Sequence, residues 1–322
     1  MKRLVIVDND SGVDDIWALN ILLNSSDIKV LGITCVNGNT TVDNVCRNNL
    51  YFLTTIGRCD IPVFKGATSQ LIPPENLQIC DDLKNFHGVN GFGDVPLPDI
   101  CFGSNLQEEN AIVALERITS KYKGEVSLVC CGPLTNVALA IRTYPHFASN
   151  VKDIFIMGGN YTALGNTTMC AEFNFHSDPE AAFIVLSGME GKTVLLPWEA
   201  CLTPNLPFEI RERLGQQGGR AIDLINKIEK PILDRMRRLN IKSWVSADAM
   251  LAAVILDDNI ITEKFTAHAT VELNGSYTRG QLVIDHLNIK DHNITIIKSL
   301  NGNFYKELLF RVVSKSLNAS TV

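Results

Sequence analysis

The sequence predicts an α/β fold, in which helices flank a doubly wound, mostly parallel sheet and a helix-rich carboxyl-terminal part follows. Short β-rich runs alternate with helical patterns through the first two thirds of the 322 residues. The β-rich runs are uninterrupted apolar stretches (LVIV, VSLVCC, IFIM, TVLL), typical of strands covered by helices on both faces. This alternation implies parallel strands joined by right-handed crossovers.

The elements of the first two thirds can be placed along the chain. Strands are expected at Leu4–Asp8, Lys29–Thr34, Pro62–Phe64, Val126–Cys131, Asp153–Met157 and Thr193–Leu196. Helices are expected at Ile16–Leu23, Val42–Ile56, Ala111–Tyr122 and Leu134–Arg142, with a further one opening at Asp178-Pro179-Glu180. The segment Gly66–Asn105 is expected to be a long loop, and such loops are usually lids, binding loops or disordered segments.

The last third of the chain is more helical. Helices are expected at Arg220–Asn240 and Ala247–Leu256, followed by two β-like runs near Phe265–Leu273 and Asn293–Lys298 and by a final helix. We find no internal repeat, low-complexity tract or linker rich in Pro, Gly and Ser. The simplest organisation is therefore a single domain over residues 1–322.

Composition excludes several classes of partner. The net charge is −6 and the basic residues are dispersed, so no nucleic-acid or acidic-membrane partner is expected. No apolar stretch reaches the length of a membrane span. Nine cysteines without a CxxC pair indicate reduced thiols, and two N-glycosylation sequons begin on candidate site residues, Asn39 and Asn166. We therefore expect a cytoplasmic protein.

The most informative segment is an aspartate cluster directly after the first strand. Asp8, Asp10, Asp14 and Asp15 fall within eight residues, and Gly12 permits the turn from strand to helix. Carboxylates this close repel one another unless a cation neutralises them, and hard oxygen ligands favour Mg²⁺ or Ca²⁺ over zinc. Capping of the helix explains one or two of the acids, but not four. The cluster therefore predicts a divalent-metal site.

Two other motifs open in a similar way. An EF-hand loop requires flanking helices, whereas a strand precedes this cluster. A haloacid-dehalogenase phosphatase also begins with Asp-x-Asp after its first strand, but it has Thr or Val where this chain has Gly12. A phosphatase is therefore the weaker enzymatic alternative.

Further polar clusters follow the other predicted strands. They are Asn37-Gly38-Asn39, Gly132–Asn136, Met157-Gly158-Gly159, the loop residues Asn166, Glu172 and Asn174, and Ser246-Ala247-Asp248 at a helix start. In a parallel sheet the ligand lies beyond the carboxyl ends of the strands, so these side chains should meet at one edge. Amides and carboxylates at such an edge suit the recognition of vicinal hydroxyl groups.

Together these motifs resemble the inosine–uridine-preferring nucleoside hydrolases, which release ribose and a free base with a bound Ca²⁺. The family's Asp-x-Asp-Pro-Gly-x-Asp-Asp is matched from Asp8 to Asp15, with Ser11 in place of proline. The other matches are Gly38-Asn39, His87–Gly93, Gly132–Asn136, Met157–Gly159, Asn166, Ala171–Asn174 and Asp178–Ala182. The matches run in order from residue 8 to residue 248. Any one motif is weak, but the ordered series is highly specific.

The resemblance implies a set of metal ligands and a catalytic base. Asp10, Asp15 and Asp248 would bind Ca²⁺ through their side chains, with the backbone carbonyl of Cys131 as a further ligand. Asp10 would also accept a proton from the attacking water. Asp8 is left as a supporting group rather than a ligand.

The resemblance also implies how the substrate is held. The side chains expected to hold the ribose hydroxyls, with the backbone near Met157 assisting, are Asp14, Asn39, Asn166, Glu172 and Asn174. The expected substrate is a small nucleoside, as in purine salvage, and the expected assembly is a homodimer or homotetramer.

The chain departs from the family at Ala247, which precedes Asp248. Some members have a His there, thought to protonate the leaving base, and others a Trp, whereas alanine can neither protonate nor stack. We expect His87 to contact the base, with Trp244, Phe86 and Phe92 as further candidates. Because Ala247 removes the usual acid, a non-catalytic nucleoside- or ribose-binding protein of this fold is a second hypothesis.

Overall fold

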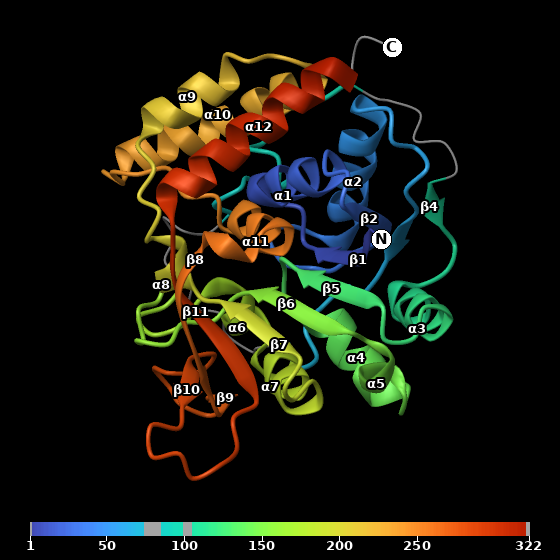
Figure 1. Cartoon of the computed structure of the whole chain (residues 1–322), viewed down its shortest axis with the longest axis vertical. Helices are drawn as coiled ribbons and strands as arrows, with labels where there is room; N and C mark the ends of the chain where they lie inside the picture. Colours follow the sequence, from blue (N-terminus) through green and yellow to red (C-terminus); the bar gives the residue numbers. More distant parts are fainter. Residues whose placement is uncertain (1, 74–84, 99–104, 320–322) are drawn as a thin grey trace.

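The computed structural model describes residues 2–73, 85–98 and 105–319. Its core is a nine-stranded sheet in the order β4-β3-β2-β1-β5-β6-β7-β11-β8 (Figure 1). The strands are β1 Arg3–Asn9, β2 Ile28–Cys35, β3 Val63–Lys65, β4 Leu106–Gln107, β5 Val126–Cys130, β6 Asp153–Met157, β7 Thr193–Leu196, β8 Ile261–Ala267 and β11 Ile294–Leu300. All neighbours are parallel except β8, which pairs antiparallel with β11. The predicted mostly parallel sheet is thus confirmed.

Helices cover both faces of this sheet (Figure 1). The helices are α1 Val13–Leu23, α2 Val42–Thr55, α3 Ala111–Lys121, α4 Thr135–Thr143, α5 Phe147–Asn150, α6 Phe173–Ser177, α7 Pro179–Gly188, α8 Trp198–Cys201, α9 Phe208–Gly215, α10 Arg220–Arg238, α11 Ala247–Leu256 and α12 Gly302–Ala319. Each face of the sheet has its own hydrophobic core, and alternate residues of β1 point into one or the other. Val5 and Val7 belong to the core covered by α1, α10 and α11. Ile6 belongs to the core covered by α3, α4 and α7. This alternation is the doubly wound arrangement that the apolar strands predict.

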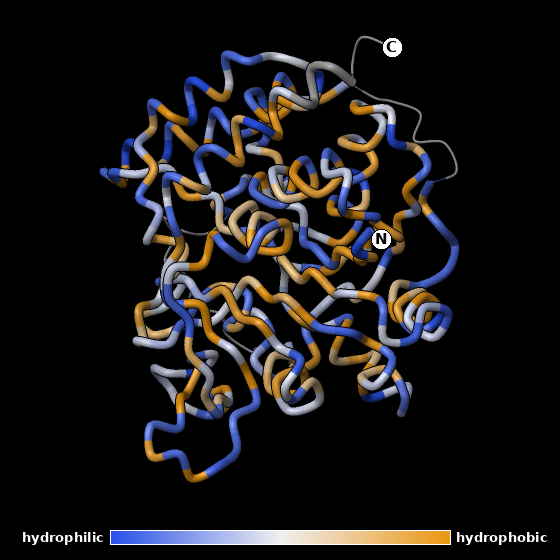
Figure 2. Tube along the Cα trace, viewed as in Figure 1, coloured by the Kyte–Doolittle hydropathy of each residue, from blue (hydrophilic) through white to orange (hydrophobic). Residues whose placement is uncertain are grey.

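Helix α11 is enclosed on all sides and has no polar stripe. Every residue from Ala247 to Ile255 is buried, and the segment is largely orange in Figure 2. It packs most extensively against α1. A helix that is apolar all round is stable only when enclosed in this way, so Asp248 in its first turn needs a specific explanation.

One expected strand is wrong. The run Phe265–Leu273 is divided at His268 into β8, in the large sheet, and β9 (Ala269–Val271), which pairs with β10 (Leu282–Ile284) in a separate two-stranded sheet. The Asn293 side chain lies at the division, where its Oδ1 accepts the Ala269 N–H at 2.8 Å and its Nδ2 donates to the Ala269 carbonyl at 2.9 Å. The pairing of β8 with β11 ends at Ala267 and Ile294, and these bonds satisfy the backbone groups of Ala269 just beyond it.

Several short elements carry no periodic signal and were not expected. They are β4, β10, α5, α6 and α8, and the longer α9 also falls where no helix was predicted. The other predicted elements lie within a few residues of the observed ones. The central strands are in register at their carboxyl ends, where Asp8 lies opposite both Thr34 of β2 and Cys130 of β5. One edge of the sheet therefore collects the side chains that follow these strands.

Candidate functional site

A cavity of about 490 Å³ lies at this edge of the sheet. It brings together most of the residues predicted to form the site, because its lining includes Asp14, Asn39, His87, Cys131, Met157, Asn166, Glu172, Asn174 and Asp248. Asp10 and Asp15 are buried beside it and are absent from its lining. Segments from residue 13 to residue 248 therefore converge here, as the ordered motifs predict.

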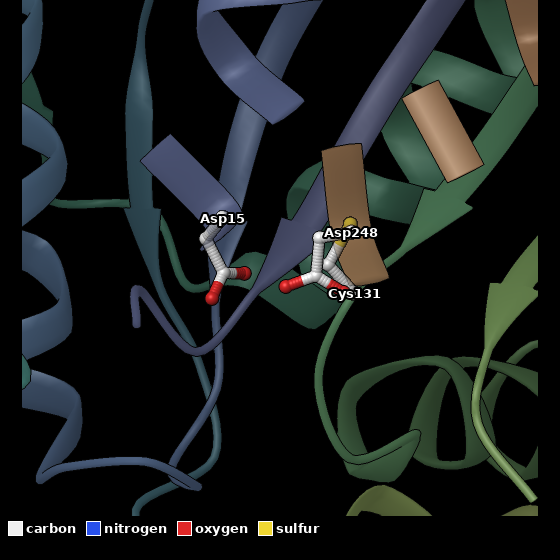
Figure 3. A group of neighbouring side chains, drawn as sticks. All are labelled: Asp15, Cys131 and Asp248. Carbon is white, nitrogen blue, oxygen red and sulfur yellow. The ribbon is translucent and has the colours of Figure 1, made fainter. Parts of the chain in front are cut away.

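Three residues at the base of the site form a potential metal-binding cluster. Asp15 of α1, Asp248 of α11 and Cys131 after β5 offer side-chain atoms that lie within 4.8 Å of one another. The two carboxylates face each other in Figure 3. Burial raises the pKa of the Cys131 thiol well above its usual value, so this side chain stays neutral. The Cys131 carbonyl is the harder ligand, and it accepts a hydrogen bond from Asn174 Nδ2 at 3.0 Å.

The electrostatics of the cluster fit a divalent cation. Asp15 Oδ1 and Asp248 Oδ1 are buried and have no hydrogen-bond partner. Burial and neighbouring carboxylates raise the pKa of both groups well above the usual range, and burial raises that of Asp10 to about 7. In the described part of the chain no Lys, Arg or His pairs with these three acids. A divalent cation would supply both the missing partner and the missing charge.

Asp10 is held in place by the segment after β2. Its Oδ2 accepts the Asn39 backbone N–H at 2.8 Å, and its Oδ1 accepts Asn39 Nδ2 at 3.0 Å. Gly38 makes this approach feasible, because a Cβ there would lie 2.1 Å from Asp10 Oδ2. The Gly38-Asn39 pair thus fixes the orientation of a buried carboxylate.

The turn that follows Asp10 positions the next two acids. Ser11 has a φ of +48°, which a proline cannot adopt, so the serine at this family position allows a backbone that proline does not. Gly12 is the N-cap of α1, and its N–H donates to Asp15 Oδ2 at 2.7 Å. Asp14 and Asp15 therefore both fall in the first helical turn, where the helix dipole favours anions.

The loop after β6 places an acid and two amides around the cavity. Glu172 caps α6, and it accepts N–H groups from Gly159, Asn174 and Phe175. Burial raises the pKa of Glu172 to about 7. Asn174 Nδ2 donates to the carbonyls of Cys131 and Met157, and so joins the ends of β5 and β6. Asn166 Oδ1 accepts the Phe173 N–H at 2.9 Å.

Asp8 lies outside the cavity lining, as expected for a supporting group. Its Oδ2 accepts hydrogen bonds from Thr34 Oγ1 at 2.6 Å and Asn136 Nδ2 at 2.8 Å. Asn136 also donates to the Cys35 carbonyl and accepts the Ala67 N–H. The Gly132–Asn136 motif therefore ties the ends of β1, β2 and β5 together beneath the site.

Two of the four candidates for contact with the base are wrong. Trp244 is 1% exposed and Phe92 is fully buried, and neither lines the cavity. His87 and Phe86 do line it, as does Trp198 at the start of α8. His87 Nδ1 accepts the Val13 N–H at 3.1 Å, while its Nε2 lies 3.6 Å from Asp14 Oδ1.

A buried polar network, which was not predicted from the sequence, lies beside the cavity. Glu229 of α10, which lines the cavity, accepts Arg211 Nε at 2.6 Å, Trp17 Nε1 at 3.1 Å and Trp244 Nε1 at 2.7 Å. The signal was present, since Glu229 lies on the apolar stripe of α10 with Ile225 four residues before it. An acid on such a stripe indicates a buried partner.

The remaining cavity lining is largely apolar. It comes from α10, from α8 and the residue after it, and from the segment 241–247, and it includes Leu202, Ile232, Met236, Ile241, Val245 and Ala247.

Among the helices of the described residues, none combines the length and the apolar character that a membrane span requires.

Comparisons with known proteins agree on one family. Residues 5–307 match the model of the family described as inosine-uridine preferring nucleoside hydrolase. An inosine-uridine preferring nucleoside hydrolase of Leishmania major is 30% identical, over 88% of each chain. A protein of Photobacterium profundum named pyrimidine-specific ribonucleoside hydrolase RihA is 31% identical, over 96% of this chain and 98% of its own.

A solved structure is similar over nearly its whole length. An inosine-guanosine nucleoside hydrolase is 27% identical and superposes with a TM-score of 0.87, covering 98% of this chain and 99% of its own. By contrast, the alignment to the uridine nucleosidase 1 of Arabidopsis thaliana, 38% identical, spans 55% of that protein's length.

Proposed function

The chain belongs to the inosine-uridine preferring nucleoside hydrolase family, and with it to the hydrolases of N-glycosyl compounds, and we propose that it uses Ca²⁺ to hydrolyse ribonucleosides to ribose and free base. The observation that carries this proposal is the set of buried acids at the cavity. Asp10, Asp15 and Asp248 are at most 3% exposed, and two of their oxygens lack any hydrogen-bond partner. Burying three ionised carboxylates together without a cation would cost several kcal/mol of folding free energy, on the order of the desolvation penalty of each ion.

The ligands proposed for the cation are all oxygen atoms. They are the carboxylates of Asp10, Asp15 and Asp248 and the carbonyl of Cys131. Hard oxygen donors of this kind suit Ca²⁺, which is generally coordinated by about six to eight oxygen atoms in a flexible geometry. The cation, when bound, would make a coordinated water more acidic and position it.

Asp10 is the residue proposed to accept the proton of the attacking water. Its carboxylate is already oriented by Asn39, so little reorganisation accompanies the proton transfer. As the N-glycosidic bond breaks, positive charge develops on the ribose ring, as in the hydrolysis of glycosides. Asp14 and Glu172 at the cavity wall stabilise this charge more in the transition state than in the ground state.

The remaining polar residues of the cavity are proposed to bind the sugar. Asn39, Asn166 and Asn174 can each donate or accept at vicinal hydroxyl groups, with the backbone near Met157 assisting. His87 is proposed to contact the base from the loop beside α1. Each of these side chains reaches the same cavity, which supports a substrate that is held at both ends.

A substrate panel tests the proposed reaction. The Ca²⁺-loaded protein is incubated with inosine, adenosine, guanosine, uridine and cytidine, and released ribose is measured. We expect ribose from at least one nucleoside, and none from the Asp10→Ala variant. Absence of ribose from every nucleoside, with metal bound, counts against the proposal. Tight nucleoside binding by calorimetry without hydrolysis would favour the non-catalytic alternative, which the presence of Ala247 at the cavity supports.

The phosphatase alternative is disfavoured by the charge of the cavity. No Lys or Arg of the described residues lines it, so no cationic side chain there can pair with a phosphate dianion. A screen with phosphomonoesters should therefore release no phosphate.

We also propose a homodimer or homotetramer in the cytoplasm. The seven cysteines of the described part are free thiols, which suits a reducing compartment. Light scattering on the purified protein measures the assembly, and a monomeric mass would contradict it.

A further inference from the structure

Glu229 of α10 is a buried carboxylate that has no part in the proposed reaction. Its side chain is 5% exposed, and hydrogen bonds reach both of its oxygens. Oε2 accepts Arg211 Nε at 2.6 Å and Trp17 Nε1 at 3.1 Å, while Oε1 accepts Trp244 Nε1 at 2.7 Å. One carboxylate therefore binds two indole groups, one on each oxygen.

The two tryptophans belong to the segments that carry two of the proposed metal ligands. Trp17 lies in α1, two residues after Asp15. Trp244 lies four residues before Asp248, in the segment that leads from α10 into α11. The Asp15 and Asp248 side chains extend toward each other from these two parts of the chain (Figure 3). Glu229 therefore joins the two elements whose relative position determines the separation of these ligands.

The two indole rings also contact each other. Their centroids lie 5.5 Å apart in an edge-to-face arrangement, with an interplanar angle of 63°. The Arg211 guanidinium lies over the Trp17 ring at 5.2 Å from its centroid. Aromatic contacts are favourable over a range of ring positions, so they do not fix the two segments by themselves. The directional N–H···O bonds to Glu229 narrow that range.

A connection of this kind needs an acceptor with two oxygens. An indole has one N–H group and no acceptor, so Trp17 and Trp244 cannot hydrogen-bond to each other. A glutamine at position 229 would offer one oxygen, and its NH2 group would face either an indole N–H or Arg211. The ion pair with Arg211 balances the charge of the carboxylate, which allows it to lie in a buried position. The chemistry of Glu229 is therefore matched to its two indole donors.

We propose that Glu229 is a positioning residue for the metal site, which holds Trp17 and Trp244 together and thereby sets the separation of Asp15 and Asp248 and the affinity for Ca²⁺. The inference rests on the proposed Ca²⁺ site and extends it to a residue that is not a ligand. A site whose ligands are already held in place loses less free energy in ordering them when the ion binds. Loss of the connection should therefore weaken binding of the ion.

Two tryptophan substitutions test this connection without removing a charge. Trp17→Phe and Trp244→Phe each keep an aromatic ring and remove the N–H donor to Glu229. The Kd for Ca²⁺ is measured by calorimetric titration of the metal-free full chain. We expect each substitution to raise this Kd by about tenfold, the lower end of the effect of groups that orient metal ligands, because Glu229 acts through the backbone of two segments. Glu229→Gln should raise the Kd at least as much.

The double variant separates a connection through Glu229 from two local packing effects. Either single substitution already breaks the connection, so Trp17→Phe combined with Trp244→Phe should raise the Kd by about the same tenfold as each change alone. Two independent effects would instead multiply to about 100-fold. A double variant at that value, or single variants with the Kd of the wild type, would overturn the inference.

Thr119→Val is the matched control for a general loss of stability. Thr119 is fully buried in α3, on the other side of the sheet, and its Oγ1 donates to the Leu115 carbonyl at 2.8 Å. We expect this variant to lose stability in urea unfolding and to keep the Kd of the wild type. A Kd raised as much as in Trp17→Phe would show that Ca²⁺ affinity merely follows stability, and would overturn the inference.

The same titrations separate this inference from the proposed function. Wild-type protein that binds no Ca²⁺ would overturn both. Wild-type binding that neither tryptophan substitution weakens would overturn the positioning role of Glu229 and leave the proposed Ca²⁺-dependent hydrolysis standing.

Discussion

The backbone and side chain of Asn39 together bind both oxygens of the Asp10 carboxylate, at 2.8 and 3.0 Å. Asp10 directly follows β1 and Asn39 follows β2, so the ends of these two neighbouring strands are joined by this contact. It explains why a glycine precedes Asn39: the Asp10 carboxylate occupies the space where a side chain at position 38 would begin. The orientation of the proposed base is therefore set by the neighbouring strand and not by Asp10 itself.

Gly38→Ala tests whether this orientation matters. The added Cβ would lie 2.1 Å from Asp10 Oδ2, so the carboxylate must move. We expect kcat for ribose release to fall by about 100-fold, since general-base catalysis contributes on that order or more. Gly188→Ala is the matched control, because the atoms nearest to its Cβ belong to the Ile141 side chain, in the helical layer of α4 and α7. A Gly38→Ala enzyme with the kcat of the wild type would refute the role given to this contact.

Asp10 and Asp8 are both buried, yet they should differ in function. Asp8→Asn keeps acceptor capacity for Thr34 and lies outside the cavity lining, so we expect kcat within about tenfold of the wild type, as for a supporting residue. Asp10→Asn cannot take up a proton and should lose at least about 100-fold. Steady-state ribose release measures both. Equal losses in the two variants would contradict the division of roles.

Glu172 should make stability depend on pH. Burial raises its folded-state pKa from 4.5 to about 7, so the folded protein holds this proton more tightly than the unfolded chain. The resulting penalty is absent below pH 4.5, grows as the pH rises, and is complete above pH 7. Glu172→Gln cannot ionise, so its stability relative to the wild type should increase by on the order of 3 kcal/mol between pH 4.5 and 8.

This prediction is checked by urea unfolding of the metal-free protein across that pH range, because a bound cation would itself lower the pKa of Glu172. The lost hydrogen bonds of the variant add an offset that does not vary with pH, so the slope alone is diagnostic. A difference between variant and wild type that is flat with pH would contradict the assignment.

The pair Arg211–Glu229 should be strongly coupled. Both side chains are almost fully buried, and removing Glu229 leaves a guanidinium and two indole N–H groups without their acceptor. We expect Glu229→Leu to cost about 3–5 kcal/mol in the free energy of unfolding, and Arg211→Met with Glu229→Leu to cost less than that single change. Denaturant unfolding of the four proteins completes the cycle. Additive losses would show that the two charges do not depend on each other.

Much of this architecture could be predicted because local patterns agree with the fold. The uninterrupted apolar runs place β1, β5, β6 and β7, and the polar residues after them must then meet at one edge. The division of Phe265–Leu273 could not be foreseen, since the Asn293 side chain, which bonds to Ala269 there, is 24 residues away. A hydrogen bond from a distant side chain to the backbone does not change the pattern of apolar residues from which strands are predicted.

The base end of the site was harder to predict than the metal end. Aspartates close together in sequence already indicate a cation, whereas Trp244 could be a stacking surface or core until its indole is seen to bond Glu229. The network of Trp17, Arg211, Glu229 and Trp244 draws on four separate segments. Such contacts become visible only when α1, α9 and α10 are packed together.

The most direct test of the central claim follows ribose release as a function of bound metal. The protein is treated with a chelator, dialysed, and titrated with Ca²⁺ while bound Ca²⁺ and the rate of ribose release from the best nucleoside are measured together. We predict that activity is lost in the metal-free protein and returns in proportion to one Ca²⁺ per chain, with Asp248→Ala neither binding the ion nor recovering activity. Full activity in protein verified to be free of metal would contradict it.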